Sequence, residues 1–156
     1  YAAHLRRECE DLGILNATVL EYVEGMAELM AASDLVICKP GGLTVTECLC
    51  AEAPMILLGR AYGQENINVR MLTSLGAALH VTTARELVGA MGHVDANPAI
   101  VEAMLTQGSF LRRPNAAIDI ARNALRLAAA EPSTDARMRK KHFLHFYWGH
   151  TPAHIR

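Results

Sequence analysis

Two adjacent glycines, Gly41 and Gly42, lie between an apolar run that ends at Cys38 and a helical pattern that begins at Leu43. Because glycine has no Cβ, the backbone there can approach a ligand closely and can adopt dihedral angles closed to other residues. The N–H groups and the positive dipole end at the start of the helix can face an anion. The pair therefore predicts either a turn that binds a diphosphate or a tight connection that binds nothing. The GxGxxG and GxxxxGK(S/T) patterns of dehydrogenases and P-loop NTPases do not occur in the sequence.

Thr44 and Glu47 follow the glycines and admit two interpretations. A threonine followed three residues later by a glutamate is typical of a capping box, in which both side chains bond to N–H groups at the start of the helix. The same carboxylate can instead accept hydrogen bonds from the vicinal hydroxyls of a sugar. The spacing alone favours the cap, and the two roles compete for the one carboxylate of Glu47.

A second cluster lies one strand–helix unit later, after the apolar run 54–59. In open α/β sheets, ligands bind at the carboxyl ends of the strands. Polar groups from two neighbouring strand ends would converge on one crevice there, as a hydroxyl-rich ligand requires. The cluster consists of Arg60, Tyr62, Gly63, Gln64, Glu65 and Asn68.

The elements that must position these residues follow from the spacing of the apolar side chains. Apolar runs without polar alternation, separated by helices, are typical of a parallel sheet with both faces covered. The sequence therefore predicts an α/β fold: a Rossmann-like, doubly wound parallel sheet with helices on both faces and a helical C-terminal annex. The predicted strands are 18–23, 34–38, 54–59 and 77–81. The predicted helices are 2–11, 26–33, 43–53, 64–75, 82–91, 115–130 and one that opens with Asn97 as cap and Pro98 at its first position.

Length and composition exclude some function classes. The chain has 156 residues, of which 51% are hydrophobic, and this suits one domain with an adequate core. A net charge of −1 gives no bulk attraction to nucleic acid. No apolar run reaches the roughly 18 residues of a spanning helix, and no signal peptide opens the chain. Because the chain starts on helix-like sequence without an initiator methionine, we expect a fragment that lacks the first strand or strands of its sheet.

The four cysteines, Cys9, Cys38, Cys48 and Cys50, include no CxxC pair. Cys48 and Cys50 fall two apart on a predicted helix, so their side chains point in different directions. We therefore expect free, buried thiols in a reducing cytoplasm and no metal site built from them.

The stretch EGMAELMAASDLVICKPGGLTVTECLCAEAPMILLG, with GQENIN after it, resembles the donor-binding half of family 28 glycosyltransferases. The nearest branch is similar to the monogalactosyldiacylglycerol synthases and processive diacylglycerol glucosyltransferases. The resemblance covers about residues 18–81. It implies the C-terminal half of a GT-B enzyme, in which two Rossmann-like domains face each other across a cleft. The C-terminal domain of such an enzyme holds the UDP-sugar.

The resemblance assigns a role to each matching position. Residues 41–44 look like the turn that binds the diphosphate, and Glu47 is similar to the glutamate that holds the ribose hydroxyls. Residues 22–23 fall where backbone groups meet the uracil. Residues 64–65 match the pair that contacts the donor sugar, with Asn68 nearby. The implied donor-binding residues are Tyr22, Val23, Gly41, Gly42, Leu43, Thr44, Glu47, Gln64, Glu65 and Asn68.

The resemblance further implies a hexosyltransferase that transfers a hexose from a UDP-sugar to a lipid acceptor such as diacylglycerol. The family needs no obligatory protein-bound metal, so we expect neither a metal site nor a cofactor. The general base is expected in the missing N-terminal domain, which would also bind the lipid, and this fragment alone is expected to be inactive. We expect His80 and His93 to be structural or solvated.

Two other function classes stay open at this point. An isomerase similar to the UDP-N-acetylglucosamine 2-epimerases shares this build, but it would need catalytic carboxylates and a histidine that we cannot place. A non-catalytic nucleotide-sugar-binding module, completed by a partner chain, fits the same motifs. An N-terminal Rossmann-like domain with a base in the same reading frame would favour the transferase.

The C-terminal tail is basic and aromatic. Four basic residues within 137–141 precede four aromatic residues within 143–148. We place a domain boundary here, with the donor-binding domain over 1–131 and the tail over 132–156. We expect a terminal helix that packs on this domain or its partner, with contact to an anionic membrane interface as the alternative. The expected location is cytoplasmic, with peripheral contact to the inner face of the membrane as a further expectation.

Overall fold

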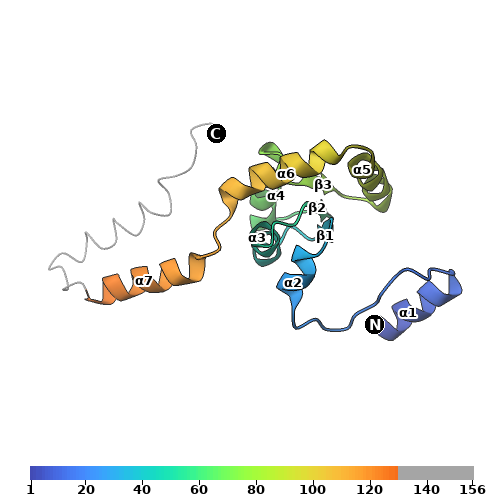
Figure 1. Ribbon diagram of the computed structural model, residues 1–156, viewed down its shortest axis with the longest axis horizontal. Helices are drawn as coiled ribbons and strands as arrows, with labels where there is room; N and C mark the ends of the chain where they lie inside the picture. The colour runs from blue at the N-terminus through green and yellow to red at the C-terminus, as the bar shows by residue number, and fades with distance from the viewer. Residues whose placement is uncertain (130–156) are drawn as a thin grey trace. The chain divides into compact units, whose positions relative to one another are not determined.

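The computed structural model of the chain describes residues 1–129 (Figure 1). The chain divides into two compact units, residues 1–114 and residues 115–156. The boundary expected at residue 131 stays a prediction. The expectations for the basic, aromatic tail lie outside the described residues.

A parallel three-stranded sheet forms the centre of the first unit. Its strands lie in the order β1 (Val36–Cys38), β2 (Met55–Leu58) and β3 (Leu79–Val81). Ile37 of β1 lies opposite Ile56 of β2, and both ladders are parallel. Each strand is joined to the next by a helix, as parallel pairing requires. These three strands confirm the prediction of a parallel sheet.

Within residues 1–129, the helices agree in number and kind with those predicted there. The most visible difference is in the helix predicted over 82–91, which continues to Ala96. Asn97 does lie at the start of the following helix, but its side chain donates to the His93 carbonyl rather than capping. The helices within residues 1–129 are α1 (Ala2–Asp11), α2 (Met26–Ala31), α3 (Gly42–Cys50), α4 (Gln64–Ser74), α5 (Ala84–Ala96), α6 (Pro98–Leu111) and α7 (Ala116–Ala129).

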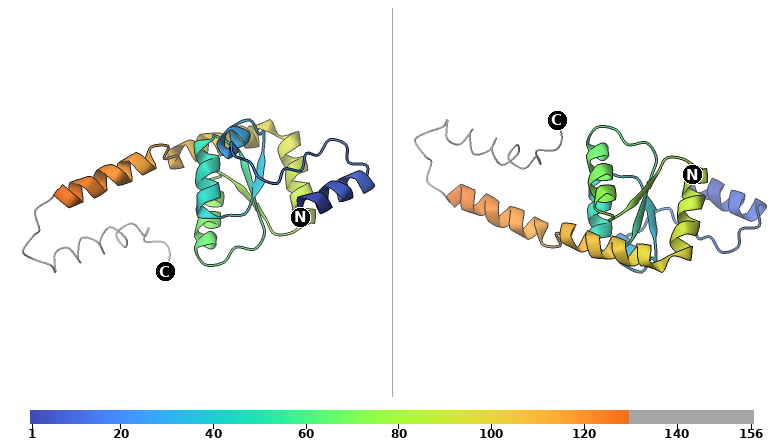
Figure 2. Two further views of the ribbon diagram at one scale, coloured as in Figure 1. Left: turned by 90° about the horizontal axis from the view of Figure 1, so that it is seen from below. Right: turned by 90° about the horizontal axis from the view of Figure 1, so that it is seen from above.

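Helices cover both faces of the sheet. Figure 2 shows α3 and α4 on one face and α5 on the other. α6 packs against both α3 and α5. This layering is the Rossmann-like α/β fold that the sequence predicts.

The strand predicted over 18–23 does not form. This segment has no regular structure, and Leu20 and Tyr22 are exposed. The Val19 carbonyl accepts hydrogen bonds from the Arg6 guanidinium at 3.1 and 3.3 Å. An apolar run becomes a stable strand only where neighbouring strands satisfy its N–H and C=O groups, and within residues 1–129 this run has no strand beside it.

The core lies between the sheet and the pair α3 and α4. Residues 55–57 of the central strand are at most 1% exposed, because strands flank them and helices cover both faces. The prediction that β1 is buried on both faces is wrong for Ile37, which is 39% exposed. Val36 and Cys38, on the other face of β1, pack against the core. The buried core side chains are Met30, Val45, Cys48, Ala53, Met55, Leu57, Val69, Leu72, Ala77 and Ala78.

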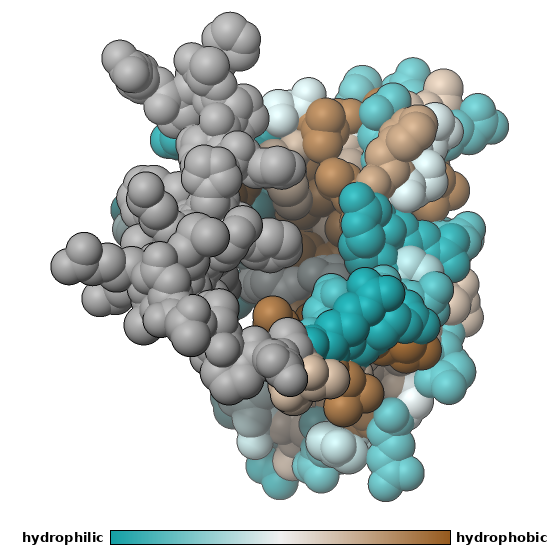
Figure 3. All heavy atoms as spheres, turned by 90° about the vertical axis from the view of Figure 1, so that its left-hand side faces the viewer, coloured by the Kyte–Doolittle hydropathy of each residue, from teal (hydrophilic) through white to brown (hydrophobic). Residues whose placement is uncertain are grey.

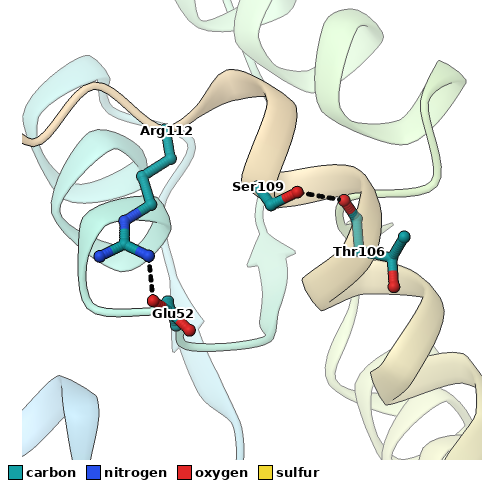
Figure 4. Close-up of polar contacts among 4 residues, drawn as sticks. All are labelled: Glu52, Thr106, Ser109 and Arg112. Carbon is teal, nitrogen blue, oxygen red and sulfur yellow. Dashed lines mark hydrogen bonds and ion pairs between the residues drawn. The ribbon is translucent and has the colours of Figure 1, made fainter.

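The C-terminal end of α3 is fastened to α6. The Arg112 guanidinium forms an ion pair with the carboxylate of Glu52, which follows α3 (Figure 4). Beside this pair, a Cβ added at Gly108 would lie 3.2 Å from Cδ2 of Leu49. Glycine at this position therefore permits the close approach of α6 to α3. A small cavity of about 70 Å³ remains between the two helices.

Apolar side chains remain exposed in both units. In the first unit, Leu43 and Tyr62 are largely exposed. Figure 3 shows brown hydrophobic residues among teal hydrophilic ones on the face of the molecule that it views. In the second unit, none of the residues of α7 is buried, and Ile118 and Leu127 are exposed. No helix within residues 1–129 has both the length and the apolar character that crossing a membrane requires.

Candidate functional site

The turn after β1 leaves backbone donors free. Gly41 is the N-cap of α3, and the first helical hydrogen bond runs from the Val45 N–H to the Gly41 carbonyl at 3.0 Å. The N–H groups of Gly42, Leu43 and Thr44 precede that bond. Within residues 1–129, no side chain caps this helix start. Three N–H groups and the positive end of the helix dipole therefore point out of the carboxyl edge of the sheet, which suits an anion.

Neither glycine of this turn is required by the fold within residues 1–129. Gly41 has φ −69° and ψ 140°, which any residue can adopt, and Gly42 is helical. The expectation of special dihedral angles is therefore wrong at both glycines. A Cβ at Gly41 would meet nothing within 4 Å, and a Cβ at Gly42 would meet only Nδ2 of Asn68, at 4.0 Å. The two glycines thus leave open space in front of the free donors, where a ligand could approach the backbone.

The capping box expected from Thr44 and Glu47 does not form. Because α3 begins at Gly42, Thr44 already lies inside its first turn. The Thr46 hydroxyl donates to the Gly42 carbonyl at 2.7 Å, and Glu47 is exposed. No hydrogen bond within the described residues engages the Glu47 carboxylate, which leaves it available to a ligand. The hypothesis that it binds ribose stays a prediction.

The second cluster sits on a loop that needs two glycines. Gly59 leaves β2 with φ 101°, and Gly63 is the N-cap of α4 with φ 54°. The Gly59 N–H donates to the Val81 carbonyl at 2.9 Å, and its own carbonyl accepts from Nε2 of His80 at 2.9 Å. The loop is therefore anchored to β3 at its first residue. His80 has the structural role that we expect for it.

Gln64 and Glu65 are the first two residues of α4. Gln64 is exposed and Glu65 is half-buried. Asn68 lies one turn further along the same helix, and its Nδ2 donates to the Pro40 carbonyl at 2.9 Å. This bond joins α4 to the residue that precedes Gly41. The structure thus brings the two predicted clusters together at one edge of the sheet.

Tyr22 and Val23 are the predicted site residues that the structure does not connect to this edge. They lie in the irregular segment before α2, where Tyr22 is 84% exposed and Val23 is half-buried. No hydrogen bond within the described residues joins them to the glycine turn. Their predicted contact with a base stays untested.

The cysteines are free thiols, as predicted, although only Cys48 is fully buried. Cys38, at the end of β1, lies against Cys48 of α3. The hydrogen bond between the two thiols lowers the pKa of Cys38, while the same bond and burial raise the pKa of Cys48. Within residues 1–129, no group of three or more His, Cys, Asp or Glu side chains is placed to hold a metal ion.

A large open groove lies at the opposite, amino edge of the sheet. Its volume is about 870 Å³, and Leu35 and Pro54, which precede β1 and β2, line it. None of the predicted site residues lines this groove. Its acidic residues are Asp34, Glu52, Asp95 and Glu102.

Two hydrogen bonds at the site could not be predicted from the sequence. The bond from Asn68 to Pro40 joins residues 28 positions apart, and the bond from His80 to Gly59 joins residues 21 positions apart. Only the spacing of Asn68 from Gln64, one helical turn, indicates that they share a face. The carbonyls that accept these bonds cannot be identified from residue type.

The family comparison covers most of the first unit. The model of the glycosyltransferase family 28 C-terminal domain matches residues 2–104. A processive diacylglycerol beta-glucosyltransferase from Staphylococcus carnosus is 40% identical over 73 residues, which are 47% of this chain and 19% of that protein. The same-named protein from Bacillus subtilis is 40% identical over 70 residues, 45% of this chain and 18% of that protein.

Further similarity extends to an N-acetylglucosamine transferase and to a solved structure. A UDP-N-acetylglucosamine--N-acetylmuramyl-(pentapeptide) pyrophosphoryl-undecaprenol N-acetylglucosamine transferase from Azotobacter vinelandii is 31% identical over 109 residues, 65% of this chain and 31% of that protein. The crystal structure of Acinetobacter baumannii MurG superposes with a TM-score of 0.57 at 25% identity, covering 66% of this chain and 31% of that one. The matched part of this chain covers only 18% to 31% of the length of these relatives. The family model matches residues 2–104, and the fold agrees with that of a solved structure. The chain therefore belongs to glycosyltransferase family 28 and contains the C-terminal domain of that family.

Proposed function

We propose that this chain is the UDP-sugar-binding domain of a hexosyltransferase that transfers a hexose from a UDP-sugar to a lipid acceptor such as diacylglycerol. Membership of the family supports the reaction class. The relatives named as diacylglycerol glucosyltransferases support the lipid acceptor. The relative named as a UDP-N-acetylglucosamine-dependent transferase supports the UDP-linked donor.

The observation that supports this function best is the uncapped start of α3. Among the described residues, the N–H groups of Gly42, Leu43 and Thr44 have no hydrogen-bond partner, and the two glycines leave open space before them. In the proposed reaction, the bond between the sugar C1 and the diphosphate oxygen breaks while C1 bonds to the acceptor oxygen. Negative charge then grows on the departing UDP. Fixed N–H donors and a helix dipole stabilise such charge without reorganising.

The other contacts to the donor follow the same assignment. The free carboxylate of Glu47 accepts hydrogen bonds from the ribose hydroxyls. Gln64 and Glu65, at the start of α4, contact the sugar. Backbone groups of Tyr22 and Val23 meet the uracil. Each of these three roles is part of the proposal.

In the proposal, acceptor binding and deprotonation take place on a different domain. A general base on an acceptor-binding domain takes the proton of the lipid hydroxyl. The proposed transfer uses no protein-bound metal or cofactor, and the N–H groups and dipole at the start of α3 stabilise the charge on the diphosphate. Because the proposed acceptor is a lipid, the transfer would take place at a membrane surface. We propose the cytoplasmic side.

Replacing Gly42 tests the diphosphate role directly. Proline is tolerated at the first position of a helix and removes one N–H donor there, and the extended Gly41 suits a residue that precedes proline. Gly42→Ala is the matched control, since it adds a Cβ but keeps the N–H. We expect Gly42→Pro to weaken UDP roughly tenfold or more relative to Gly42→Ala, because the lost hydrogen bond is to a charged group. Calorimetric titration measures both variants, and equal UDP affinity in the two would contradict the proposed site.

A further inference from the structure

We propose that Asn68 is a positioning residue, which holds the diphosphate turn in its binding geometry through the Pro40 carbonyl rather than by touching the donor. This inference rests on the proposed function, because it concerns how the same site is kept in shape. It differs from the family-based expectation, which places Asn68 near the donor sugar.

The hydrogen bond itself is the first observation. Nδ2 of Asn68 donates to the Pro40 carbonyl at 2.9 Å, and the bond is partly buried. Pro40 is among the fully buried residues of the chain. Its carbonyl belongs to the peptide plane that ends in the Gly41 nitrogen. A donor fixed on that oxygen therefore fixes the plane from which the chain turns into α3.

The local backbone explains why such a bond is needed. Gly41 and Gly42 have no side chains with which to pack, and no side chain in the described part of the chain caps the start of α3. Glycine is also the residue with the greatest conformational freedom to lose. Without an outside constraint, the three free N–H groups would point in a range of directions. Preorganised donors stabilise charge better than donors that must first be ordered.

The position of Asn68 on α4 adds a second consequence. Gln64 lies one turn before it, so both are on the same face of the helix. The bond to Pro40 therefore fixes that face of α4 against the turn. A Cβ at Gly42 would come no closer than 4.0 Å to Nδ2 of Asn68, so the amide lies beside the turn without filling the space in front of it. The amide nitrogen of Asn68, which faces the turn, is therefore already hydrogen-bonded to the Pro40 carbonyl.

The test compares three variants of the full chain. Asn68→Ala removes the amide, and Asn68→Leu removes its hydrogen-bonding groups while keeping a similar volume. Asn66→Ala is the matched control, since Asn66 is an exposed asparagine on the same helix. The ligands are UDP and a UDP-hexose, titrated by calorimetry.

A positioning role predicts that both Asn68 variants weaken UDP and the UDP-hexose by the same factor, roughly two- to tenfold, the worth of one hydrogen bond. Asn66→Ala should bind both as the wild type does. If the Asn68 variants lose affinity for the UDP-hexose but not for UDP, Asn68 contacts the sugar and the inference is wrong. If they lose nothing for either ligand, the inference is also wrong.

Amide hydrogen exchange without ligand tests the mechanism separately from donor binding. The Val45 N–H bonds to Gly41 at the turn, and the Ala51 N–H bonds to Glu47 at the other end of α3. We expect Asn68→Ala to speed exchange at Val45 more than at Ala51. Equal acceleration at both would indicate a general loss of stability and would overturn the positioning role. If the wild type binds no UDP, the proposed function fails, and this exchange ratio alone decides the role of Asn68.

Discussion

At two helix starts in this molecule, those of α3 and α5, a threonine is followed three residues later by a glutamate, and the fold treats the two differently. At α5, Thr83 accepts from the Glu86 N–H at 3.2 Å, and the Glu86 carboxylate accepts from the Thr82 N–H at 2.7 Å. At α3, neither Thr44 nor Glu47 takes part in a cap. The same spacing therefore gives a closed helix start in one place and an open one in the other.

The difference comes from where each helix begins. Thr83 is extended, with φ −130° and ψ 157°, so α5 starts directly after it. At α3, the extended residue is Gly41, and the helix begins at Gly42, so Thr44 is its third residue. An open helix start is a cost to stability unless something else satisfies its N–H groups. On our account that partner is the diphosphate, and Glu47 is freed for the ribose.

The largest expected effect is on ligand binding at the open start. We expect Glu47→Ala to weaken UDP by roughly ten- to a hundredfold, because a charged acceptor of ribose hydrogen bonds contributes on the order of 1.5–3 kcal/mol. Its free energy of unfolding should stay close to that of the wild type, since Glu47 caps nothing. Calorimetry and urea unfolding measure the two quantities. Glu102→Ala, which removes an exposed carboxylate from α6, is the control and should change neither. A loss of stability without a loss of UDP affinity would mean that Glu47 is structural.

A smaller effect is expected at the closed start. Thr83→Ala removes the cap of α5, which should lower the free energy of unfolding by about 0.5–2 kcal/mol. UDP affinity should not change, because Thr83 lies outside the proposed site. Thr44→Ala, measured for stability alone, is the matched comparison and should have a much smaller effect. Equal destabilisation by the two substitutions would contradict the claim that Thr83 caps its helix and Thr44 does not.

The smallest effect is a pH dependence at the closed start. The backbone N–H and then the hydroxyl of Thr82 donate to Glu86 and lower the pKa of its carboxyl from the ordinary 4.5. A lowered pKa means that the folded state favours the charged form, so this stabilisation is complete above pH 4.5 and is lost as the pH falls through the folded-state value. Urea unfolding of the wild type and Glu86→Gln between pH 7 and pH 3 should show the gap between them shrinking on acidification. A gap that is constant with pH would contradict this role of Glu86.

Elements with a clear apolar pattern could be predicted from the sequence. The strand at 55–58 and the helices that flank it follow from spacing alone, because the core needs their apolar faces. The segment 18–23 is also rich in apolar and β-branched residues and still forms no strand. Strand formation depends on a neighbour in space, which residue type does not reveal.

The candidate site also has features that could be predicted from the sequence and features that could not. The two clusters and their meeting at one edge of the sheet follow from the rule for parallel sheets. The failure of the Thr44 cap does not, because the sequence at Thr83 has the same spacing and does cap. The choice depends on the backbone at Gly41. The bond from Asn68 to Pro40 likewise requires the packed pair of α3 and α4.

The most direct test of the central claim, that the open start of α3 holds a uridine diphosphate with Glu47 on its ribose, is a calorimetric titration of the wild type with UDP and with 2′,3′-dideoxy-UDP. Our account predicts that UDP binds roughly tenfold or more tightly than the dideoxy compound. It also predicts that Glu47→Gln reduces this preference without changing the melting temperature. If the wild type binds the two nucleotides equally well, Glu47 does not hold the ribose and the account is wrong.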